Sequence, residues 1–559
     1  MSAEDDLNEL LAAPIGAVDA EPPRTVSAVT VRGGAFDGAS RSDQLALWAP
    51  PIQSANAEIL PDKEVLDSRT RDIVRNDAHI GAGATIHKDN IVGGIYLLNA
   101  KPKTSVLFPR RDMGSWEEEF QEEVETKFTL YAESDECWID AQRTKTLTEI
   151  IRLVIDQDYS VGEALLTAEW MPDDGRPART AVQVVDTDRL MTPFIANNRS
   201  RIFGGVEVDR YGGPIAYYIR MGHPTDFMDP RFYEFRRVMA NKPWGRPMVA
   251  HLYDQVRPAQ ARGISTMVAA LREMKMLKGF RQVELQRAVL AATYAASMES
   301  DLPAADVMRM LGDGVDQGSV IDYMTAYLGA VAEFSGGAKH LKIDGAKIPV
   351  LPPGTKMNMK SPGAESPAGD KFEQSMLRYL ASATGTSYEA LSKDYSQINY
   401  ATGRMSKGQA DNHMAARKRR ADQAAGFAYK LWLEEQINKG AIETLRGVKA
   451  PNFYEGQNAD AYTSCQWLGA GMPMIDPLKE TQADVLSLKN GLTTKEVVIA
   501  RRHGSDWRSV NRQIAREMAN DKELGVPSVY ALAPTDAENA LSGSPQVREN
   551  DGESGSSSE

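Results

Sequence analysis

The sequence GTSYEALSKDYSQINYATGRMS, residues 385–406, separates two strongly helical patterns. Before it, a run that starts at Asp370 repeats apolar residues at three- and four-residue steps and stops at Gly385, where a glycine is typical of a helix C-terminus. After it, a second helical pattern continues over 403–439. Because the residues between these patterns are polar and aromatic without a period, we predict a loop over 386–402.

The predicted loop mixes tyrosines with cationic and amide side chains, which suits contact with a nucleic-acid backbone. Tyrosine and lysine side chains on a loop can bind phosphate and sugar groups without reading the base sequence. The alternative is that the tyrosines only anchor the loop to the protein. The candidate contact residues are Lys393, Tyr395, Gln397, Asn399, Tyr400 and Arg404.

Upstream of the loop, the periodicity predicts an α+β module. Residues 116–134 repeat large apolar side chains at steps of four, and residues 146–166 carry a second apolar face, as amphipathic helices do. The sequence YGGP at 211–214 predicts a hairpin turn between two strand-like stretches. The strand-like stretches lie at 91–100, 180–190, 201–220 and 247–254.

Between this module and the loop lie further helices and a segment rich in Gly and Pro. One helical pattern runs over 262–299 and a shorter one over 320–334. Residues 336–369 combine many Gly and Pro residues with short strand-like runs, which predicts a small protruding element. The C-terminal part is helical again, with a predicted capping box from Thr493 to Glu496.

The formal net charge of −13 is concentrated at the two ends of the chain. Residues 1–30 and residues 536–559 each hold six acids and one base, so each end contributes −5. The body from 31 to 535 is left at −3. The composition of the ends predicts disordered acidic tails. A nearly neutral body argues against tight wrapping around nucleic acid, because such binding depends on neutralised phosphates.

Common catalytic and cofactor motifs are absent from the sequence. There is no GxxxxGK[ST] loop, as an ATPase would need, and GAGATIH at 81–87 lacks the third glycine of a dinucleotide fingerprint, so we expect an ordinary turn there. Neither GxSxG nor HExxH occurs, and the seven histidines are scattered without metal-ligand spacing. We therefore expect no catalytic residue, no metal and no cofactor.

The same survey bears on the compartment. No run of about 18 apolar residues occurs, so we expect no membrane span. The acidic start lacks the features of a signal peptide. Two distant cysteines, Cys137 and Cys465, do not form a disulfide framework. We expect the chain to work in a reducing cytoplasm.

Two pairs of carboxylates leave an enzymatic alternative open. Asp156 with Asp158, and Asp186 with Asp188, are close enough in sequence to serve a two-metal nuclease. Their ordinary interpretation is structural, at a helix end and at a strand end. The run RKRR at 417–420 lies in a predicted helix and points around its circumference, which favours a solvated or intersubunit salt-bridging turn over a focused DNA-binding stripe.

Several segments, and the order in which they follow one another along the chain, resemble the lambda-type portal proteins of tailed bacteriophages. The most specific is DYSQINY at 394–400, inside the stretch quoted above. The resemblance covers roughly residues 60–525 and leaves out both charged tails. The other matching segments are VVDTDRLMTP (184–193), GGVEVDRYGGPIAYYIRMGHP (204–224), HLYDQVRPAQARGIS (251–265), LPPGTKMNMKSP (351–362) and the block at 465–507.

The resemblance implies a portal-protein fold: a mixed α/β wing, a helical stem, a small β-containing clip and a helical crown around a DNA channel. The helix at 262–299 could replace the one at 320–336 as the first stem helix. By the order of elements we expect an N-terminal arm at 1–60, the wing at 61–319, the first stem helix at 320–336, the clip at 337–369, the second stem helix at 370–385, the tunnel loop at 386–402, a long wing helix and connection at 403–464, the crown at 465–530 and a tail at 531–559.

The resemblance also implies a function. Such proteins form a ring, usually of twelve subunits, at one capsid vertex of the virion after assembly in the host cytoplasm. The implied partners are double-stranded DNA passing without sequence preference, the terminase large subunit, the major capsid protein and head-completion or tail adaptor proteins. The alternatives are a carboxylate-dependent metal nuclease and a capsid scaffold or adaptor without a channel. The candidate residues for docking terminase at the clip are Lys339, His340, Lys342, Lys347 and Lys356.

Overall fold

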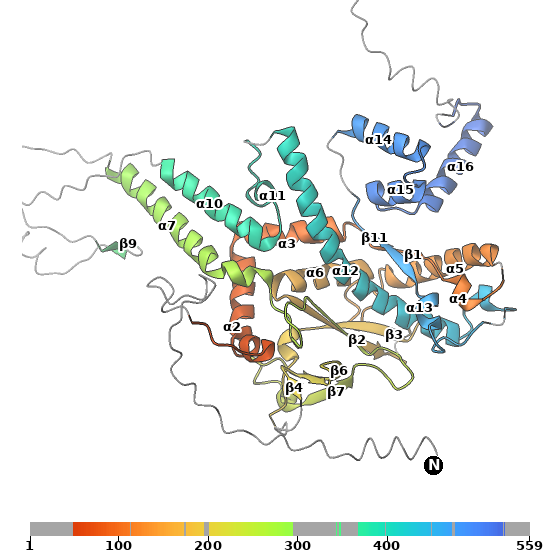
Figure 1. Ribbon diagram of the computed structural model, residues 1–559, viewed down its shortest axis with the longest axis horizontal. Coiled ribbons are helices and arrows are strands. Elements are labelled where there is room, and N and C mark those ends of the chain that lie inside the picture. Colours follow the sequence, from red (N-terminus) through yellow and green to blue (C-terminus); the bar gives the residue numbers. More distant parts are fainter. Residues whose placement is uncertain are drawn as a thin grey trace, which may run out of the picture. The chain divides into compact units, whose positions relative to one another are not determined.

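Figure 1 shows the computed structural model of the chain. The chain divides into two compact units, residues 1–54 and 55–559, and every element below belongs to the second unit. Both predicted acidic tails and the helix predicted at 320–336 lie outside the described residues. The structure describes residues 49–111, 113–172, 175–194, 201–294, 342–343, 346–347, 367–396, 399–448, 450–471, 476–528 and 530.

The larger core lies between α5 (Gly114–Ala132) and the C-terminal half of α12 (Tyr400–Asn438). All four apolar residues at steps of four on α5 are buried, so the predicted face is confirmed. From this face, Phe128 meets Tyr429 and Trp432 of α12 edge-on, with ring centroids 5.3 and 5.2 Å apart. Aromatic edge-to-face packing adds to the energy of burial, and here it holds α12 against the rest of the module.

The helix predicted over 146–166 is shorter in the structure. It is α6 (Leu147–Ser160), and from Glu163 the chain continues as strand β2 (Glu163–Trp170). The change of direction occurs at Gly162, whose φ is +80°. A Cβ there would lie 2.1 Å from the carbonyl carbon of Ile264, so the turn requires glycine. The prediction failed because a short apolar run after a helix fits either state.

Two antiparallel sheets form the β part of the module. In the first sheet, β2 lies between β3 (Thr180–Val185) and β8 (Val249–Tyr253). The turn predicted at 211–214 joins two strands of the second sheet, where Asp209 Oδ1 accepts the N–H groups of Tyr211 and Gly213 at 2.8 and 2.7 Å. The hairpin is confirmed. The second sheet has the order β4 (Ile202–Phe203), β5 (Val206–Val208), β6 (Pro214–Arg220) and β7 (Phe235–Met239).

A buried charge network ties α2 (Ala55–Asn76) to the first sheet. Glu163 is fully buried and accepts hydrogen bonds from Arg262 Nη2 at 2.6 Å and from the Gly263 N–H at 2.7 Å. Lys63 Nζ of α2 lies 3.2 Å from the same carboxylate. Burial alone would raise the pKa of Glu163, but Arg262 and Lys63 hold that pKa well below its ordinary value. The carboxylate is therefore charged and shared by three segments of the chain.

The glycine-rich segment at 81–85 is helical, and the expectation of a turn there is wrong. It lies within α3 (Ala78–Ile91), whose N-terminus is capped by Asp77. A Cβ on Gly83 would lie 2.4 Å from the hydroxyl oxygen of Tyr159 on α6. The glycine is needed for the close approach of two helices, which sequence alone does not distinguish from a chain reversal.

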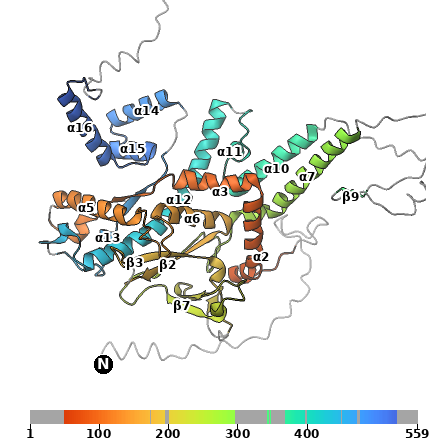
Figure 2. The same cartoon turned by 180° about the vertical axis from the view of Figure 1, so that it is seen from behind.

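A second core joins α2 and α3 to α7 (Leu271–Tyr294), α10 (Pro367–Thr384) and the short α11 (Tyr388–Ser392). Figures 1 and 2 show α7 and α10 running side by side. The Phe280 and Phe372 rings lie 5.0 Å apart, and Arg281 Nε donates to Glu373 Oε1 at 2.7 Å. Helix α10 begins before Asp370, the predicted start of this run and candidate N-cap, and ends at Gly385 as predicted.

The C-terminal part starts with a strand and continues as three helices. The strand is β11 (Cys465–Leu468), which pairs with β1 (Leu97–Ala100). Strand β1 is only the end of the strand-like run predicted at 91–100, because the helix α3 still includes Ile91 at the start of that run. The predicted capping box does not form, because the cap is Thr494 rather than Thr493 and the residue three positions later is then Val497 instead of a glutamate. Thr494 caps α15 by accepting the Val497 N–H, and Glu496 pairs with Lys101. The helices are α14 (Pro477–Lys489), α15 (Lys495–His503) and α16 (Trp507–Leu524).

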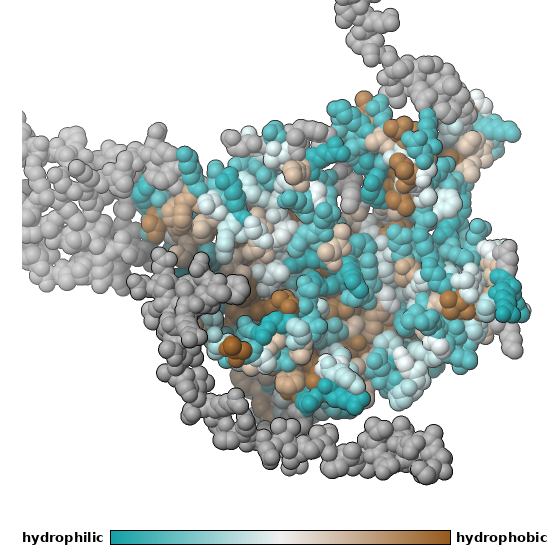
Figure 3. All heavy atoms as spheres, in the orientation of Figure 1, coloured by the Kyte–Doolittle hydropathy of each residue, from teal (hydrophilic) through white to brown (hydrophobic). Residues whose placement is uncertain are grey.

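These three helices bury no side chain completely. Figure 3 shows apolar side chains at the surface over α14 and α15. The contact with α5 and β1 is polar: Arg508 of α16 donates to Gln121 and, at 3.3 Å, to Asn99 Oδ1. The C-terminal helices are therefore attached to the module through hydrogen bonds rather than through a common core.

Glu125, on α5 beneath this contact, should make stability fall as pH rises. Its Oε1 accepts the Ala100 N–H at 2.8 Å, and burial raises its pKa to about 7. The folded state therefore holds a proton that the unfolded chain releases near its ordinary pKa of 4.5, and stability is lost between these two pH values. Relative to Glu125→Gln, the native protein should lose on the order of 2 kcal/mol over this interval in urea titrations.

The matched control for this prediction is Glu118→Gln, because Glu118 lies on the same helix with an exposed side chain. Its pH profile should follow that of the unsubstituted protein. Parallel profiles for the native protein and Glu125→Gln would contradict the assignment.

Short elements complete the fold. Both cysteines are free thiols. Within the described ranges, none of the helices has the length and apolar character needed to cross a bilayer. The remaining elements are α4 (Thr104–Leu107), α13 (Asn458–Tyr462), β9 (Lys342–Ile343), β10 (Ala346–Lys347) and the 3₁₀ turns Thr187–Arg189, Pro230–Tyr233, Thr266–Ala270 and Glu443–Leu445.

Candidate nucleic-acid contact segment

The candidate segment starts where α10 ends. Gly385 adopts a left-handed conformation with φ +70°, and the Thr386 N–H donates to the Ala381 carbonyl at 3.1 Å, which is a Schellman motif. A Cβ on Gly385 would lie 2.2 Å from Nε2 of His413 on α12. The turn thus sets α10 directly against α12, so the position of one helix depends on the other.

The predicted loop is not wholly irregular, because it contains α11. Ser387 caps this helix by accepting the Ala390 N–H at 3.2 Å, and Leu391 is fully buried in the second core. Nδ1 of His79, on α3, lies 2.9 Å from the carbonyl oxygen of Leu391. The Arg378 guanidinium lies 5.1 Å above the Tyr388 ring. Tertiary burial stabilises a helix of only five residues whose sequence has no detectable period.

Beyond α11, the described residues 393–396 and 399 are largely exposed and make local hydrogen bonds. Lys393 ends α11 in a left-handed conformation with φ +60°. Asp394 Oδ1 accepts the N–H and hydroxyl of Ser396 at 3.0 and 2.7 Å. Asn399 caps α12 by accepting the Thr402 N–H at 2.8 Å. These contacts hold the Tyr395 side chain at 57% exposure between two capped helices.

The structure brings some of the six candidate residues together. Tyr395, Asn399 and Arg404 line one hollow of about 390 Å³, bounded by α3, α11 and α12. Lys393 is exposed but does not line this hollow. Tyr400 is the first residue of α12 rather than part of the loop, and Gln397 lies outside the described residues. The hollow therefore has an amide, a phenol and a guanidinium at its edge.

A hydrogen bond between α11 and α12, not anticipated from the sequence, also borders this hollow. The Ser406 hydroxyl donates to Glu389 Oε2 at 3.1 Å. Both residues line the hollow. No periodicity or motif links positions 389 and 406, so this contact could not be found before the two helices were placed.

The basic run at 417–420 is mostly internal, which corrects its interpretation as a solvated or intersubunit turn. Arg417 is buried, and Arg417 and Arg420 point their Nη1 atoms at Asp158 Oδ2 of α6, at 3.4 and 2.8 Å. Lys418 donates to Asp422 at 2.6 Å, and Arg419 is exposed. The ion pairs with Asp158 join α12 to α6. Because four consecutive residues point to different sides of a helix, the run does not form a DNA-binding stripe.

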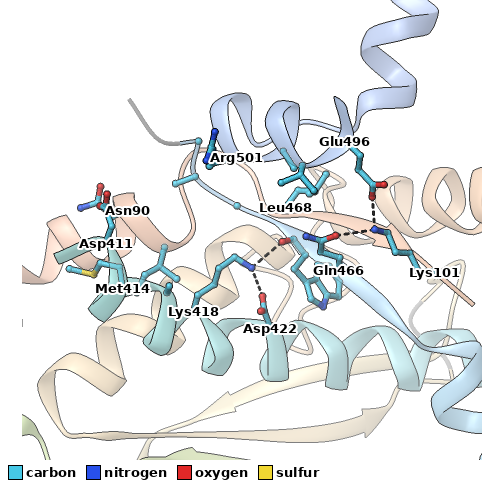
Figure 4. Close-up of a pocket in the computed structure, with 18 of the residues that line it drawn as sticks. Asn90, Lys101, Asp411, Met414, Lys418, Asp422, Gln466, Leu468, Glu496 and Arg501 are labelled. Atoms are coloured by element: carbon cyan, nitrogen blue, oxygen red, sulfur yellow. Dashed lines mark hydrogen bonds and ion pairs between the residues drawn. The ribbon is translucent and has the colours of Figure 1, made fainter. Parts of the chain in front are cut away.

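A second hollow of about 460 Å³ adjoins the first, since both are lined by Asn90, Asp411 and Met414, and it extends along α12 to β11 and α15 (Figure 4). Lys418 Nζ donates to the Trp467 carbonyl at 3.0 Å, and Lys101 Nζ donates to Gln466 Oε1 at 3.1 Å and pairs with Glu496. These lysines have partners within the chain. The hollow therefore separates α12 from α15, with paired lysines at a lining that also includes apolar residues such as Met414, Leu468 and Val497.

The comparisons with known proteins identify the family. The family model described as phage portal protein, lambda family, matches residues 41–418. The chain belongs to the lambda family of phage portal proteins. Like other members, this portal protein is a structural, non-enzymatic component of the virion that is connected with DNA packaging.

Two curated relatives resemble this portal protein over nearly its whole length. The portal protein of Escherichia phage N15 is 32% identical over 510 residues, which cover 90% of this chain and 92% of the relative. Portal protein B of Escherichia phage lambda is 31% identical over 501 residues, covering 89% and 91%. A chain from a solved structure described as the neck of an empty gene transfer agent particle, computed with C6 symmetry, is 13% identical, with a TM-score of 0.39 over 82% of this chain and 94% of that one.

The carboxylates that suggested a nuclease serve other purposes in this portal protein. Asp186 and Asp188 lie near His223, with their ligand atoms within 4.8 Å of one another. Arg71 of α2 occupies both carboxylates: it bonds Asp188, with Nη2 at 3.0 Å from Oδ1, and reaches Asp186 Oδ1 at 3.2 Å. A guanidinium in this place competes with any cation. Asp156 pairs with Lys88 at 2.8 Å.

The clip candidates are only partly described. Lys342 and Lys347 lie directly opposite each other in the antiparallel pair β9 and β10. The prediction of a short β-containing element agrees with these two strands at this point. Lys339, His340 and Lys356 lie outside the described residues.

Proposed function

We propose that this portal protein forms a twelve-subunit ring at one capsid vertex, and that the segment 386–402, together with Arg404 in the first turns of α12, lines the channel for double-stranded DNA. The observation that carries this proposal is the exposed set Lys393, Tyr395 and Arg404 beside a frame of packed helices. Among the described residues, Lys393 and Arg404 make no ion pair, so their charges are available to phosphate oxygens. Two cations in each subunit can contact the DNA phosphates. Because the body of the chain is nearly neutral, this contact does not amount to strong binding of the DNA.

Within this proposal, α7 and α10 form the stem. Their contact through Phe280, Phe372, Arg281 and Glu373 supports the alternative in which the 262–299 helix is the first stem helix. The clip then lies within 295–366, between the two stem helices. The elements from α2 to β8 form the wing, and α14–α16 form the crown.

The remaining parts of the proposal follow from the family. A ring of this kind receives the terminase large subunit at the clip during packaging and head-completion or tail adaptor proteins afterwards, and it contacts the major capsid protein. A scaffold or adaptor without a channel is the competing proposal. A scaffold or adaptor would not need exposed cations on this segment. The test below therefore separates it from the channel proposal.

The test combines Lys393→Ala, Tyr395→Ala and Arg404→Ala in one variant. Deleting 390–400 would be less informative, because it would remove the fully buried Leu391 and the helix cap Asn399. The triple variant should assemble into rings by negative-stain microscopy and mass photometry. Filled heads should retain DNA less well by about tenfold, because each subunit loses two cations.

The matched control replaces the same residue types on the wing: Arg210→Ala, Tyr211→Ala and Lys242→Ala, all of which are exposed. This control should package and retain DNA normally. Loss of rings in the loop variant, or equal effects in both variants, would count against the proposed channel segment. A native protein that never exceeds one or two subunits would count against the ring itself.

A further inference from the structure

A groove between α2 and α7 has a different character from the channel segment. Its volume is about 910 Å³. Apolar side chains form its floor, including half-buried Leu66, Ile73 and Val268 and the 57% exposed Met276. An apolar floor open to this degree is unusual for surface that faces only water.

Cations surround this floor on both helices. Arg69 and Arg75 come from α2, and Arg272 and Lys275 come from α7. The acid among the lining residues is Asp72, which lies 3.7 Å from Arg75. Arg69, Arg272 and Lys275 make no ion pair within the described residues, and all three are exposed. The groove therefore carries a net positive charge around an apolar base.

The combination decides between classes of ligand. A DNA backbone would satisfy the cationic rim but leave the apolar floor in contact with water. A segment that carries both carboxylates and large aliphatic side chains would satisfy rim and floor together, through charge complementarity and burial. The groove therefore fits an acidic, leucine-containing peptide segment better than it fits nucleic acid.

We propose that this groove binds the acidic N-terminal segment, residues 4–15, of a second copy of the chain. This inference rests on the proposed ring, which places copies side by side. The segment EDDLNELLAAPI holds Glu4, Asp5, Asp6 and Glu9, interleaved with Leu7, Leu10, Leu11 and Ile15, and the chain has no Lys or Arg before Arg24.

Length permits the segment to reach a neighbouring copy. About 40 residues lie between Ile15 and the start of α2, and an extended chain of this length spans up to roughly 130 Å. Binding by a neighbour would join adjacent subunits at α2 and α7. It would also neutralise a charged end of each chain in the assembled particle.

Zero-length carbodiimide cross-linking of full-length rings tests this contact. The reagent joins a lysine amine to a carboxylate in direct contact, so Lys275 should couple to Glu4, Asp5, Asp6 or Glu9. Rings assembled from a mixture of 14N- and 15N-labelled protein should yield these products as mixed-isotope pairs. The exposed Lys371 on α10 is the internal control and should not couple to them.

Charge reversal in the groove supplies the second test. The variant Arg69→Glu/Arg272→Glu/Lys275→Glu should lose the N-terminal cross-links and should bind a fluorescent peptide of residues 1–21 at least about tenfold more weakly, because three attractive contacts become repulsive. A peptide with Leu7, Leu10 and Leu11 replaced by Ser should bind the native protein equally poorly.

The outcomes separate this inference from the ring proposal. Rings that form normally but give no N-terminal cross-links to Lys275 would overturn the inference and leave the ring intact. Cross-links confined to one isotope would also overturn it, because the contact would then lie within one chain. Charge reversal that abolishes binding of a 20-bp DNA duplex while peptide binding persists would assign the groove to nucleic acid. Absence of rings would instead count against the proposed function.

Discussion

Glu163→Ala is expected to destabilise the protein by about 3–5 kcal/mol, because it leaves the buried Arg262 without its ion-pair partner, while Lys63 keeps Asp67 as an ion-pair partner at 2.9 Å. Arg262 donates to Glu163 through Nε at 3.0 Å and Nη2 at 2.6 Å, and Lys63 Nζ lies 3.2 Å away. Both cations are nearly inaccessible to water in the native protein. The Gly263 N–H would also lose its acceptor.

The loss should appear as a lower urea midpoint in far-UV circular dichroism. Glu207→Ala is the matched control, since Glu207 pairs with Arg237 at 2.8 Å while its side chain is 24% exposed. Ion pairs of that kind contribute about 0–1 kcal/mol. Equal midpoint shifts for Glu163→Ala and Glu207→Ala would show that burial of the network does not determine its energy.

The same network predicts the direction of acid sensitivity. The pKa of Glu163 in the folded protein lies well below its ordinary value of 4.5. Its contribution to stability is therefore fully present above that ordinary value and is lost as pH falls through the folded pKa. Glu163→Ala should lose this component of the acid transition. The difference in free energy of unfolding between the native protein and the variant should therefore become smaller below about pH 4.

Features that depend on a single element followed from its own sequence pattern. The buried face of α5 follows from large apolar residues at steps of four, and the β5–β6 hairpin follows from YGGP at 211–214. Gly385 ends α10 because a left-handed residue is needed at that point. Each of these depends on local geometry, which periodicity and turn chemistry describe well.

Features that depend on two elements could not be predicted in this way. The glycine at position 83 looks like a turn residue until Tyr159 is placed 2.4 Å from its missing Cβ. The cations at 417 and 420 look solvated until α6 brings Asp158 to them. At the candidate site, sequence identified Tyr395, Asn399 and Arg404 as members of one segment, but only the fold shows that they border one hollow.

The helix pair α7 and α10 illustrates the same limit at a larger scale. Residues 295–366 separate them in the sequence, and the helical pattern at 262–299 does not by itself indicate which helix it packs against. The pairing becomes evident from contacts between Phe280 and Phe372 and between Arg281 and Glu373. Long-range pairing of helices is specified by complementary side chains, which single-helix periodicity does not reveal.

Gly385→Ala should have the second large effect, about 2–5 kcal/mol, because two penalties coincide at this residue. Its φ of +70° places any Cβ in the left-handed region, and that Cβ would lie 2.2–2.5 Å from three atoms of the His413 ring. His413 cannot move freely, since its Nε2 is already buried between α10 and α12. Relief of the clash would have to shift α11 relative to α12, and with it the segment that carries Tyr395.

A comparison with another helix end separates the two penalties. Gly440 also ends a helix in the left-handed region, with φ +64°, but nothing lies within 4 Å of a Cβ placed on it. Gly440→Ala should therefore show only the backbone penalty, about 1–2 kcal/mol. The excess for Gly385→Ala measures the steric contact with α12, and urea titrations of the two variants give both values.

The double variant Gly385→Ala/His413→Ala isolates the contact further. Removing the ring should recover the steric part, so the double-mutant cycle should give a coupling of about 1–3 kcal/mol, while the backbone penalty remains. If the clash with the His413 ring also displaces the segment proposed to line the channel, DNA retention in filled heads should fall for Gly385→Ala and recover in the double variant, although both keep the left-handed alanine. Retention that fails to recover would mean that the turn itself, rather than its contact with α12, positions the segment.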